Sequence, residues 1–210
     1  MSNSGVHRFT YAQRVVHWVV GLSFVLLLFT GLAFSYPSLF WITTLFGGGP
    51  AARVLHPVAG VVFSIGLVLM FFMWLKDMFI GKADIQWMKA IRAYASHQRD
   101  KVPPTGKYNG GQKTFFWVES VAGLVLLLTG LPLWMPEGFL GTGHFSGGFI
   151  STMRLLHYLA ALGGGLFLIV HVYLGTIAYP GTLSGMISGR VSRGWARMHH
   201  PLWYKEKAGS

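Results

Sequence analysis

The chain has 210 residues, of which 52% are hydrophobic and only 11% are charged, and this composition excludes an ordinary soluble domain. Its formal net charge is +11, but the distribution of the cations, described below, argues against a nucleic-acid-binding protein and no nucleic-acid partner is expected. The chain has no cysteine, which excludes disulfides and iron–sulfur clusters held by its own thiolates.

Four long stretches with almost no charge follow one another along the chain, at 15–36, 54–75, 114–135 and 155–179. Each exceeds the roughly 20 residues that cross a hydrocarbon core of about 30 Å. The first stretch is too long for a signal-peptide core and is expected to stay uncleaved. The sequence therefore predicts an all-α membrane protein, with four transmembrane helices in a bundle and one domain over residues 1–210.

The connections carry their own signals. Gly47-Gly48-Gly49-Pro50 predicts a turn between the first two spans, and Pro57 is expected in the first turn of the second span, where it is tolerated. Between the second and third spans, residues 83–97 have apolar residues near helical spacing, which predicts a short amphipathic helix on the membrane surface. A glycine-rich loop is expected over 137–149.

Lys and Arg gather on one side of these spans. Segments 1–14, 76–113 and 190–207 hold two, eight and five of them, whereas the other side holds only Arg53 and Arg154. By the positive-inside rule, both termini and the central loop are expected in the cytoplasm. The basic, aromatic tail over 180–210 is then cytoplasmic.

Histidines lie in or at the ends of three of the four spans: His17, His56, and the pair His157 and His171 in the last one. Fourteen steps of about 100° and 1.5 Å separate the last two, which returns the helix to nearly the same face about 21 Å further along. One helix thus presents an imidazole near each side of the bilayer. Imidazole in hydrocarbon is costly and indicates a functional site by default.

Matching the depths of these histidines pairs His56 with His157 on the outer side and His17 with His171 on the inner side. This layout predicts two haems b, each held by two axial imidazoles and not by covalent attachment. Two axial ligands leave no open position on the iron, so such sites transfer electrons and do not bind oxygen. A single histidine in a membrane helix is more often a helix contact or a proton carrier, and that alternative stays open for each position.

Small residues accompany the histidines. One turn after each, on the same face, stand Gly21, Gly60, Ala161 and Gly175, and Gly164 lies between the two histidines of the last span. A porphyrin lying against a helix needs such gaps, although small residues also serve plain helix–helix packing.

Arginines precede three of the histidines by three positions. These residues are Arg14, Arg53 and Arg154, and each guanidinium is expected at the aqueous edge, where haem propionates need cationic partners. The alternative is ordinary snorkelling of a long side chain at a helix end.

Several longer motifs match a known family. They are Arg53-x-x-His56-Pro57, the run Gly106-Lys107-Tyr108-Asn109-Gly110-Gly111-Gln112-Lys113, the two histidines of the last span, and the tail His199-His200-Pro201-Leu202-Trp203-Tyr204. On these motifs the chain closely resembles, almost end to end, the gamma subunit of membrane-bound respiratory formate dehydrogenase, a di-haem cytochrome b. The resemblance implies the same four haem ligands in the same two pairs.

The resemblance also implies a quinone site on the cytoplasmic side, formed by the haem edge at His171 and by Asn109, Gly110, Gly111 and Gln112, for menaquinone or ubiquinone. The residues allow this, because amides can donate to a quinone carbonyl and glycines let the backbone come close. Without the resemblance, this segment would be interpreted as a turn.

The implied partners are an iron–sulfur beta subunit and a molybdenum- or tungsten-containing alpha subunit that oxidises formate, in a complex of anaerobic respiration that can form a higher oligomer. Electrons would pass through the outer and then the inner haem to the quinone. The alternatives are the cytochrome b subunit of a nickel–iron hydrogenase or related oxidoreductase, a stand-alone di-haem membrane cytochrome, and a transport protein with histidine proton relays.

Glu119 departs from the family pattern, in which this position is apolar. It could carry protons to the quinone site, reach the lipid headgroups, or bond to a neighbouring helix. His199 and His200 are expected in a segment that contacts the interface or a partner rather than a metal, and His7, His97 and His144 are expected in solvated loops.

Overall fold

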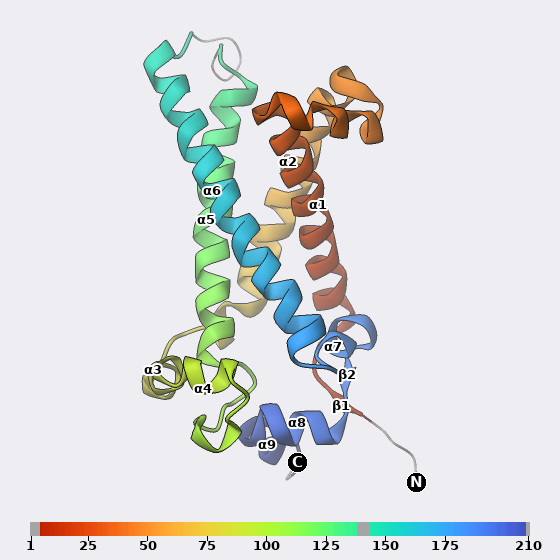
Figure 1. Ribbon diagram of the computed structural model, residues 1–210, viewed down its shortest axis with the longest axis vertical. Coiled ribbons are helices and arrows are strands. Elements are labelled where there is room, and N and C mark those ends of the chain that lie inside the picture. Colours follow the sequence, from red (N-terminus) through yellow and green to blue (C-terminus); the bar gives the residue numbers. More distant parts are fainter. Residues whose placement is uncertain (1–4, 138–142, 209–210) are drawn as a thin grey trace. The chain divides into compact units, whose positions relative to one another are not determined.

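The computed structural model describes residues 5–137 and 143–208 (Figure 1). It divides into two compact units. We call one the bundle unit (Val15–Met70 and Glu119–Leu168) and the other the tail unit (Met1–Arg14, Phe71–Val118 and Ile169–Ser210). Each is described by itself. Part of the predicted glycine-rich loop, residues 138–142, lies outside the described residues.

Four long helices supply the bundle unit (Figure 1). They are α1 (Tyr11–Ser35), α2 (Gly48–Trp74), α5 (Gly110–Trp134) and α6 (Gly147–Tyr173), and a π-helical segment, Leu174–Ala178, continues α6. All four are long and apolar enough to cross a membrane, so the predicted all-α fold with four spans is confirmed. The helices begin before the predicted spans, α6 at Gly147 and not at Leu155, because hydropathy detects the hydrocarbon-facing part and not the polar first turns.

The core of the bundle unit is small. Val20, Phe24 and Phe63 are buried together, and the two phenylalanine rings lie 5.5 Å apart. Leucines from all four helices pack around them: Leu27, Leu67, Leu126 and Leu168. Many other large apolar side chains of these helices are exposed, which is the expected arrangement where the solvent is lipid and not water.

The start of α2 corrects one prediction. A 3₁₀ segment, Pro37–Phe46, precedes it, and Gly47 and Gly48 turn the chain with φ of +86° and +91°, so the predicted turn is confirmed. Since α2 already begins at Gly48, Pro57 lies inside the helix, and the prediction of a first-turn position is wrong. Pro57 has no N–H, so it cannot bond to the carbonyl of Arg53 one turn back.

The tail unit brings the two ends of the chain together. Strand β1 (Val6–His7) pairs antiparallel with β2 (Arg190–Val191), with Val6 opposite Val191. Val191 also joins Trp195, Ala196 and Trp203 in a buried apolar cluster. This pairing attaches the N-terminal segment to the C-terminal tail.

Besides the ends of the long helices, the tail unit contains short helices. They are the 3₁₀ turns Leu75–Asp77 and Arg99–Lys101, and the helices α3 (Lys82–Lys89), α4 (Ile91–Ala95), α7 (Leu183–Ser188), α8 (Arg193–His199) and α9 (Pro201–Ala208). The single amphipathic helix predicted over 83–97 is therefore two helices, which meet at Ala90. Ser192 begins α8, where its Oγ accepts the Trp195 N–H at 3.1 Å.

Candidate functional site

Two of the predicted histidine ligands face each other in the bundle unit. His56 on α2 and His157 on α6 have ring centroids 6.4 Å apart and ring planes at 59°. The Nδ1 atom of His56 lies 2.7 Å from Oγ1 of Thr30, and that of His157 lies 2.9 Å from Oγ1 of Thr129. Because hydrogen bonds occupy the Nδ1 atoms, Nε2 is the nitrogen that each ring can offer to a metal.

The spacing of this pair fits two axial ligands of one metal. Metal–imidazole bonds of about 2.0–2.1 Å place two opposed Nε2 atoms about 4 Å apart, and the ring centres about 1 Å further out on each side. The expected separation of roughly 6 Å agrees with the observed 6.4 Å. Among the described residues, no group of three or more His, Cys, Asp or Glu could hold a bare metal ion. A two-histidine site therefore suits a metal whose other ligands come from a porphyrin.

The inner histidines lie in different units. His17, in the bundle unit, has its ring edge-on to Trp18 with centroids 5.5 Å apart. His171, in the tail unit, stacks on Phe115 of α5 at 4.5 Å, with the rings 15° from parallel. Their pairing stays a prediction.

The small residues near the histidines fall into two kinds. A Cβ added at Gly21 or Gly175 would meet no atom within 4 Å, and at Gly60 it would meet only Leu27, at 4.0 Å. These positions leave the space that a flat macrocycle needs beside its ligand. At Gly164, by contrast, an added Cβ would lie 3.1 Å from the Phe24 ring, so this glycine serves packing within the bundle. The roles of these glycines and of half-buried Ala161 toward a haem stay predictions.

The three arginines differ in their exposure and in their contacts. Arg53 and Arg154 are exposed, as a partner at the aqueous edge would be. Arg14 donates a hydrogen bond to the carbonyl of Ile187 and lies over the Tyr11 ring at 5.5 Å, so it fastens the start of α1 to the tail. Contact of any of the three with a propionate stays a prediction.

Asn109 and Gln112 form the cap of α5. The Asn109 N–H donates to Oε1 of Gln112 at 3.0 Å, and the Gln112 N–H donates to Oδ1 of Asn109 at 2.9 Å, which is a reciprocal capping box. A Cβ at Gly110 would lie 2.6 Å from the Asp84 carbonyl oxygen, and a Cβ at Gly111 would lie 2.9 Å from the ring of Trp87. These glycines therefore allow α3 to pack on the start of α5. The cap uses only the side-chain oxygens of Asn109 and Gln112, and the side-chain NH₂ groups take no part in the two hydrogen bonds of the cap.

Glu119 points into the bundle unit. Its Oε1 is buried and has no hydrogen-bond partner among the described residues, and its Oε2 lies 3.3 Å from the place of a Cβ on Gly164 of α6. This position disfavours the headgroup alternative. An unpartnered carboxylate oxygen in the bundle is compatible with the proton-carrier alternative, which stays a prediction.

Sequence reasoning missed two residues of the tail unit. Arg8, only 5% exposed, donates to the Lys107 carbonyl at 2.7 Å and lies 3.1 Å from Nε2 of His200. His200 is 2% exposed, and its Nδ1 lies 2.8 Å from the Gly106 carbonyl. His200 therefore lies inside the tail unit, because the tail folds back onto residues 106–107, and contact of this segment with the interface or a partner stays a prediction.

Burial sets the ionisation of this pair. It lowers the pKa of Arg8 to about 10, and it lowers the pKa of His200 well below its ordinary value, with the charge of Arg8 as the second cause. His200 is therefore neutral, with Nδ1 donating to Gly106 and Nε2 accepting from Arg8. Four aromatic rings surround the Arg8 guanidinium at 4.9–5.7 Å: Phe9, Tyr108, Trp195 and Trp203.

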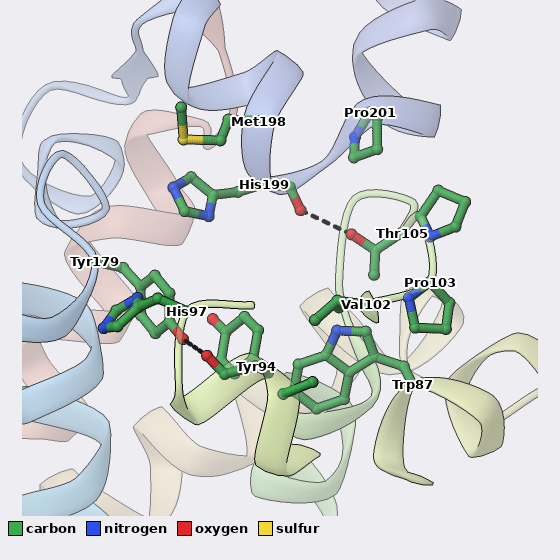
Figure 2. A pocket seen from close by; sticks show the side chains of 12 residues that line it. Trp87, Tyr94, His97, Val102, Pro103, Thr105, Tyr179, Met198, His199 and Pro201 are labelled. Atoms are coloured by element: carbon green, nitrogen blue, oxygen red, sulfur yellow. Dashed lines mark hydrogen bonds between the residues drawn. The ribbon is translucent and has the colours of Figure 1, made fainter. Parts of the chain in front are cut away.

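A cavity of about 170 Å³ lies elsewhere in the tail unit (Figure 2). Five of its lining residues are aromatic or histidine: Trp87, Tyr94, His97, Tyr179 and His199. Two hydrogen bonds close it, from the Tyr179 hydroxyl to the Tyr94 carbonyl and from the Thr105 hydroxyl to the His199 carbonyl, both 2.8 Å long. It is smaller than the roughly 300–1,000 Å³ of common ligand pockets, and residues 109–112 do not line it.

Comparison with known proteins agrees with the histidine pair. The sequence model of the family described as prokaryotic cytochrome b561 matches residues 8–189. The cytochrome b556(fdo) subunit of formate dehydrogenase from Escherichia coli (strain K12) is 35% identical over 199 residues, which cover 95% of this chain and 92% of that protein. A nitrate-inducible formate dehydrogenase cytochrome b556(Fdn) subunit of the same strain is 34% identical, with coverages of 95% and 90%.

A third relative extends the comparison to another organism. The formate dehydrogenase cytochrome b556 subunit of Haemophilus influenzae is 31% identical over 194 residues, which cover 92% of this chain and 80% of that protein. The resemblance inferred from the motifs is thus confirmed. A cytochrome b carries haem b, and the spacing of His56 and His157 fits that group. The chain belongs to the prokaryotic cytochrome b561 family.

Proposed function

We propose that the chain is the membrane cytochrome b subunit of a formate dehydrogenase and connects an iron–sulfur partner to a quinone. The observation that carries the proposal is the facing pair His56 and His157, 6.4 Å apart, in a chain 35% identical to such a subunit. Bound haem supplies a one-electron redox couple inside the membrane. Formate oxidation itself belongs to a partner subunit.

The roles of the chain's own residues follow from their positions. His56 and His157 hold an outer haem b, and His17 and His171 hold an inner one. Arg53 and Arg154 neutralise propionates at the outer edge and Arg14 at the inner edge. The open faces at Gly21, Gly60 and Gly175 accommodate the macrocycles, with Ala161 at the corresponding position of α6.

Charge sets the orientation. Fifteen of the 17 Lys and Arg lie on the side of the two termini and the central connection, which supports a cytoplasmic position for that side, with the chain in the inner membrane of a bacterium. The iron–sulfur and the molybdenum- or tungsten-containing subunits then dock on the opposite, periplasmic side. Inward electron movement opposes the membrane potential, at about 2.3 kcal/mol per charge per 100 mV, so we expect the outer histidine pair to hold the haem of lower potential.

Quinone reduction belongs at the cytoplasmic side, at the start of α5. The NH₂ groups of Asn109 and Gln112 remain as donors once their oxygens are engaged in the cap, and Gly110 and Gly111, on which α3 packs, complete the segment. Glu119, nine residues into the same helix, supplies protons taken up from the cytoplasm.

The test is a reduced-minus-oxidised visible spectrum with haem quantitation on the protein purified with its natural partners. We expect two haems b per chain, both reduced on addition of formate. Reduction by hydrogen and not by formate would instead establish the hydrogenase alternative, and activity of the purified lone chain would establish the stand-alone cytochrome. Absence of a Soret band would show that the protein binds no haem. Of the alternatives, only a transport protein with histidine proton relays would then remain.

A further inference from the structure

Two buried threonines hold the outer histidine pair from helices that contribute no ligand to it. Thr30 on α1 is 0% exposed and Thr129 on α5 is 3% exposed. The first lies 2.7 Å from Nδ1 of His56, and the second lies 2.9 Å from Nδ1 of His157. All four residues belong to the bundle unit.

The direction of these hydrogen bonds can be assigned from the rest of the network. The Thr30 hydroxyl donates to the Leu26 carbonyl at 2.9 Å, and the Thr129 hydroxyl donates to the Val125 carbonyl at 2.6 Å. A hydroxyl has one hydrogen to donate, so each Oγ1 accepts from the imidazole. Both rings therefore carry their proton on Nδ1 and have the lone pair on Nε2.

A glycine follows each threonine and completes the arrangement. A Cβ at Gly31 would lie 3.5 Å from Cε1 of His56, and a Cβ at Gly130 would lie 3.3 Å from Cε1 of His157. Each Thr-Gly pair thus places a hydroxyl against one atom of the imidazole and leaves room for the next. The same Thr-Gly arrangement therefore occurs on α1 beside His56 and on α5 beside His157.

Ordinary helix chemistry explains only part of this geometry. A threonine in a membrane helix often bonds to the carbonyl four residues earlier, as Thr152 does to Gly148 at 3.0 Å. That bond does not bring an oxygen within 3 Å of an imidazole nitrogen. The hydroxyl oxygens of Thr30 and Thr129 bond to the helix carbonyl and also lie within 3 Å of an imidazole Nδ1. The two imidazoles concerned are the two that face each other.

We propose that Thr30 and Thr129 are positioning residues for the axial ligands of the outer haem, an inference that rests on the proposed function. They fix the Nδ1–H tautomer and the orientation of each ring. An accepted hydrogen bond on Nδ1–H also makes the imidazole a more basic ligand. A more basic ligand stabilises ferric over ferrous iron, which keeps the potential of the outer haem low.

The test replaces each hydroxyl with a methyl group of nearly the same size, in Thr30→Val and Thr129→Val, within the complete complex. We expect the midpoint potential of one haem to rise while the other stays unchanged. A tenfold loss of preference for ferric iron would correspond to a rise of about 59 mV for a one-electron couple. We also expect weaker haem retention, within the roughly 10–100-fold range typical of such partners.

Controls separate positioning from packing. Thr30→Ser and Thr129→Ser keep the hydroxyl and lose the methyl group, so they should restore the wild-type potential and electron paramagnetic resonance spectrum. Thr152→Val removes a hydroxyl that bonds only to the helix backbone and should change neither. Unchanged potentials and spectra in both Val variants at positions 30 and 129 would overturn the proposal.

A measurement on the unaltered protein covers the case in which the Val variants do not assemble. In the complex labelled with ¹⁵N-histidine and with both haems in the diamagnetic, low-spin ferrous state, both outer ligands should show a protonated, hydrogen-bonded Nδ1, and a deprotonated Nδ1 would overturn the proposal. This outcome is distinct from failure of the proposed function, which would appear in the wild-type complex as missing haem or as no reduction by formate.

Discussion

At the scale of single residues, the outer site depends on side chains with one role each. His56 and His157 face each other, and Thr30 and Thr129 hold their Nδ1 atoms. The two hydrogen bonds from histidine to threonine each join two different helices. Substitutions here should therefore have local and separable effects.

Replacing His56 with Gln should remove the outer haem and leave the inner one. Glutamine fills similar space but is not an axial haem ligand of the kind proteins use. Haem quantitation should fall from two haems b per chain to one, whereas His144→Gln, in an exposed loop position, should retain both. Two haems with unchanged absorbance in the His56 variant would contradict the assignment of this ligand.

Replacing Glu119 with Gln should slow quinone reduction and the accompanying proton uptake, because an amide keeps the shape of the buried group but cannot release a proton. We expect a loss on the order of tenfold or more, since positioned acids and bases contribute at least that much. Haem content should not change. The exposed Glu137 provides a matched control as Glu137→Gln, and equal rates in both variants would reject the relay.

At the scale of elements, specific hydrogen bonds and close packing hold the start of α5 and the C-terminal tail in place. The start of α5 is fixed by a capping box and by glycines that admit α3. The tail is fixed by the buried pair Arg8 and His200, which binds the carbonyls of Gly106 and Lys107. Both sets of interactions lie in or next to the proposed quinone segment. A substitution there can change the stability of the protein as well as quinone binding, so the two must be measured separately.

Asn109→Asp separates the cap of α5 from quinone binding. Aspartate caps a helix about as well as asparagine, so the thermal stability should stay close to that of the wild type. It lacks the NH₂ donor, so the KM for quinone should rise. Asn109→Ala, which removes both groups, should in addition lose about 1 kcal/mol of stability, and an unchanged KM in the Asp variant would exclude Asn109 as the donor.

Docking of the tail should weaken in mildly acidic solution. His200 has a pKa well below its ordinary value of 6.5 when docked, whereas a released tail would titrate near the ordinary value. The released state therefore binds more protons, and the contribution of His200 is complete above about pH 6.5 and is lost as the pH falls. Arg8 and His199 are the charged or titratable neighbours that depress this pKa.

Hydrogen exchange of residues 193–208 between pH 8 and pH 5 should show this loss of protection. In His200→Gln, which retains an acceptor and a donor, the protection should vary less with pH. Equal pH dependence in the variant and the wild type would assign the effect to another group.

At the scale of the whole molecule, charge and hydropathy predict how the chain lies in the membrane. Four long apolar helices and 15 of 17 cations on one side leave one favoured orientation. A fluorescent protein fused to the C-terminus should therefore fluoresce, whereas alkaline phosphatase fused there should be inactive. Active phosphatase would reverse the direction of electron flow proposed above. Moving the phosphatase to the loop after α1 provides the positive control.

The sequence by itself determined the four spans, the histidines with their fourteen-residue spacing and the family, because hydropathy and helical periodicity are local properties of the chain. Only the tertiary structure decided what each histidine contacts. Thr30 and His56 are 26 positions apart, Thr129 and His157 are 28 apart, and Arg8 and His200 are 192 apart. No periodic pattern links such residues, because a hydrogen bond between two helices depends on how the helices pack. Pro57, expected in a first turn, lies inside α2 for a different reason: the helix already begins at the glycine turn before the hydrophobic span.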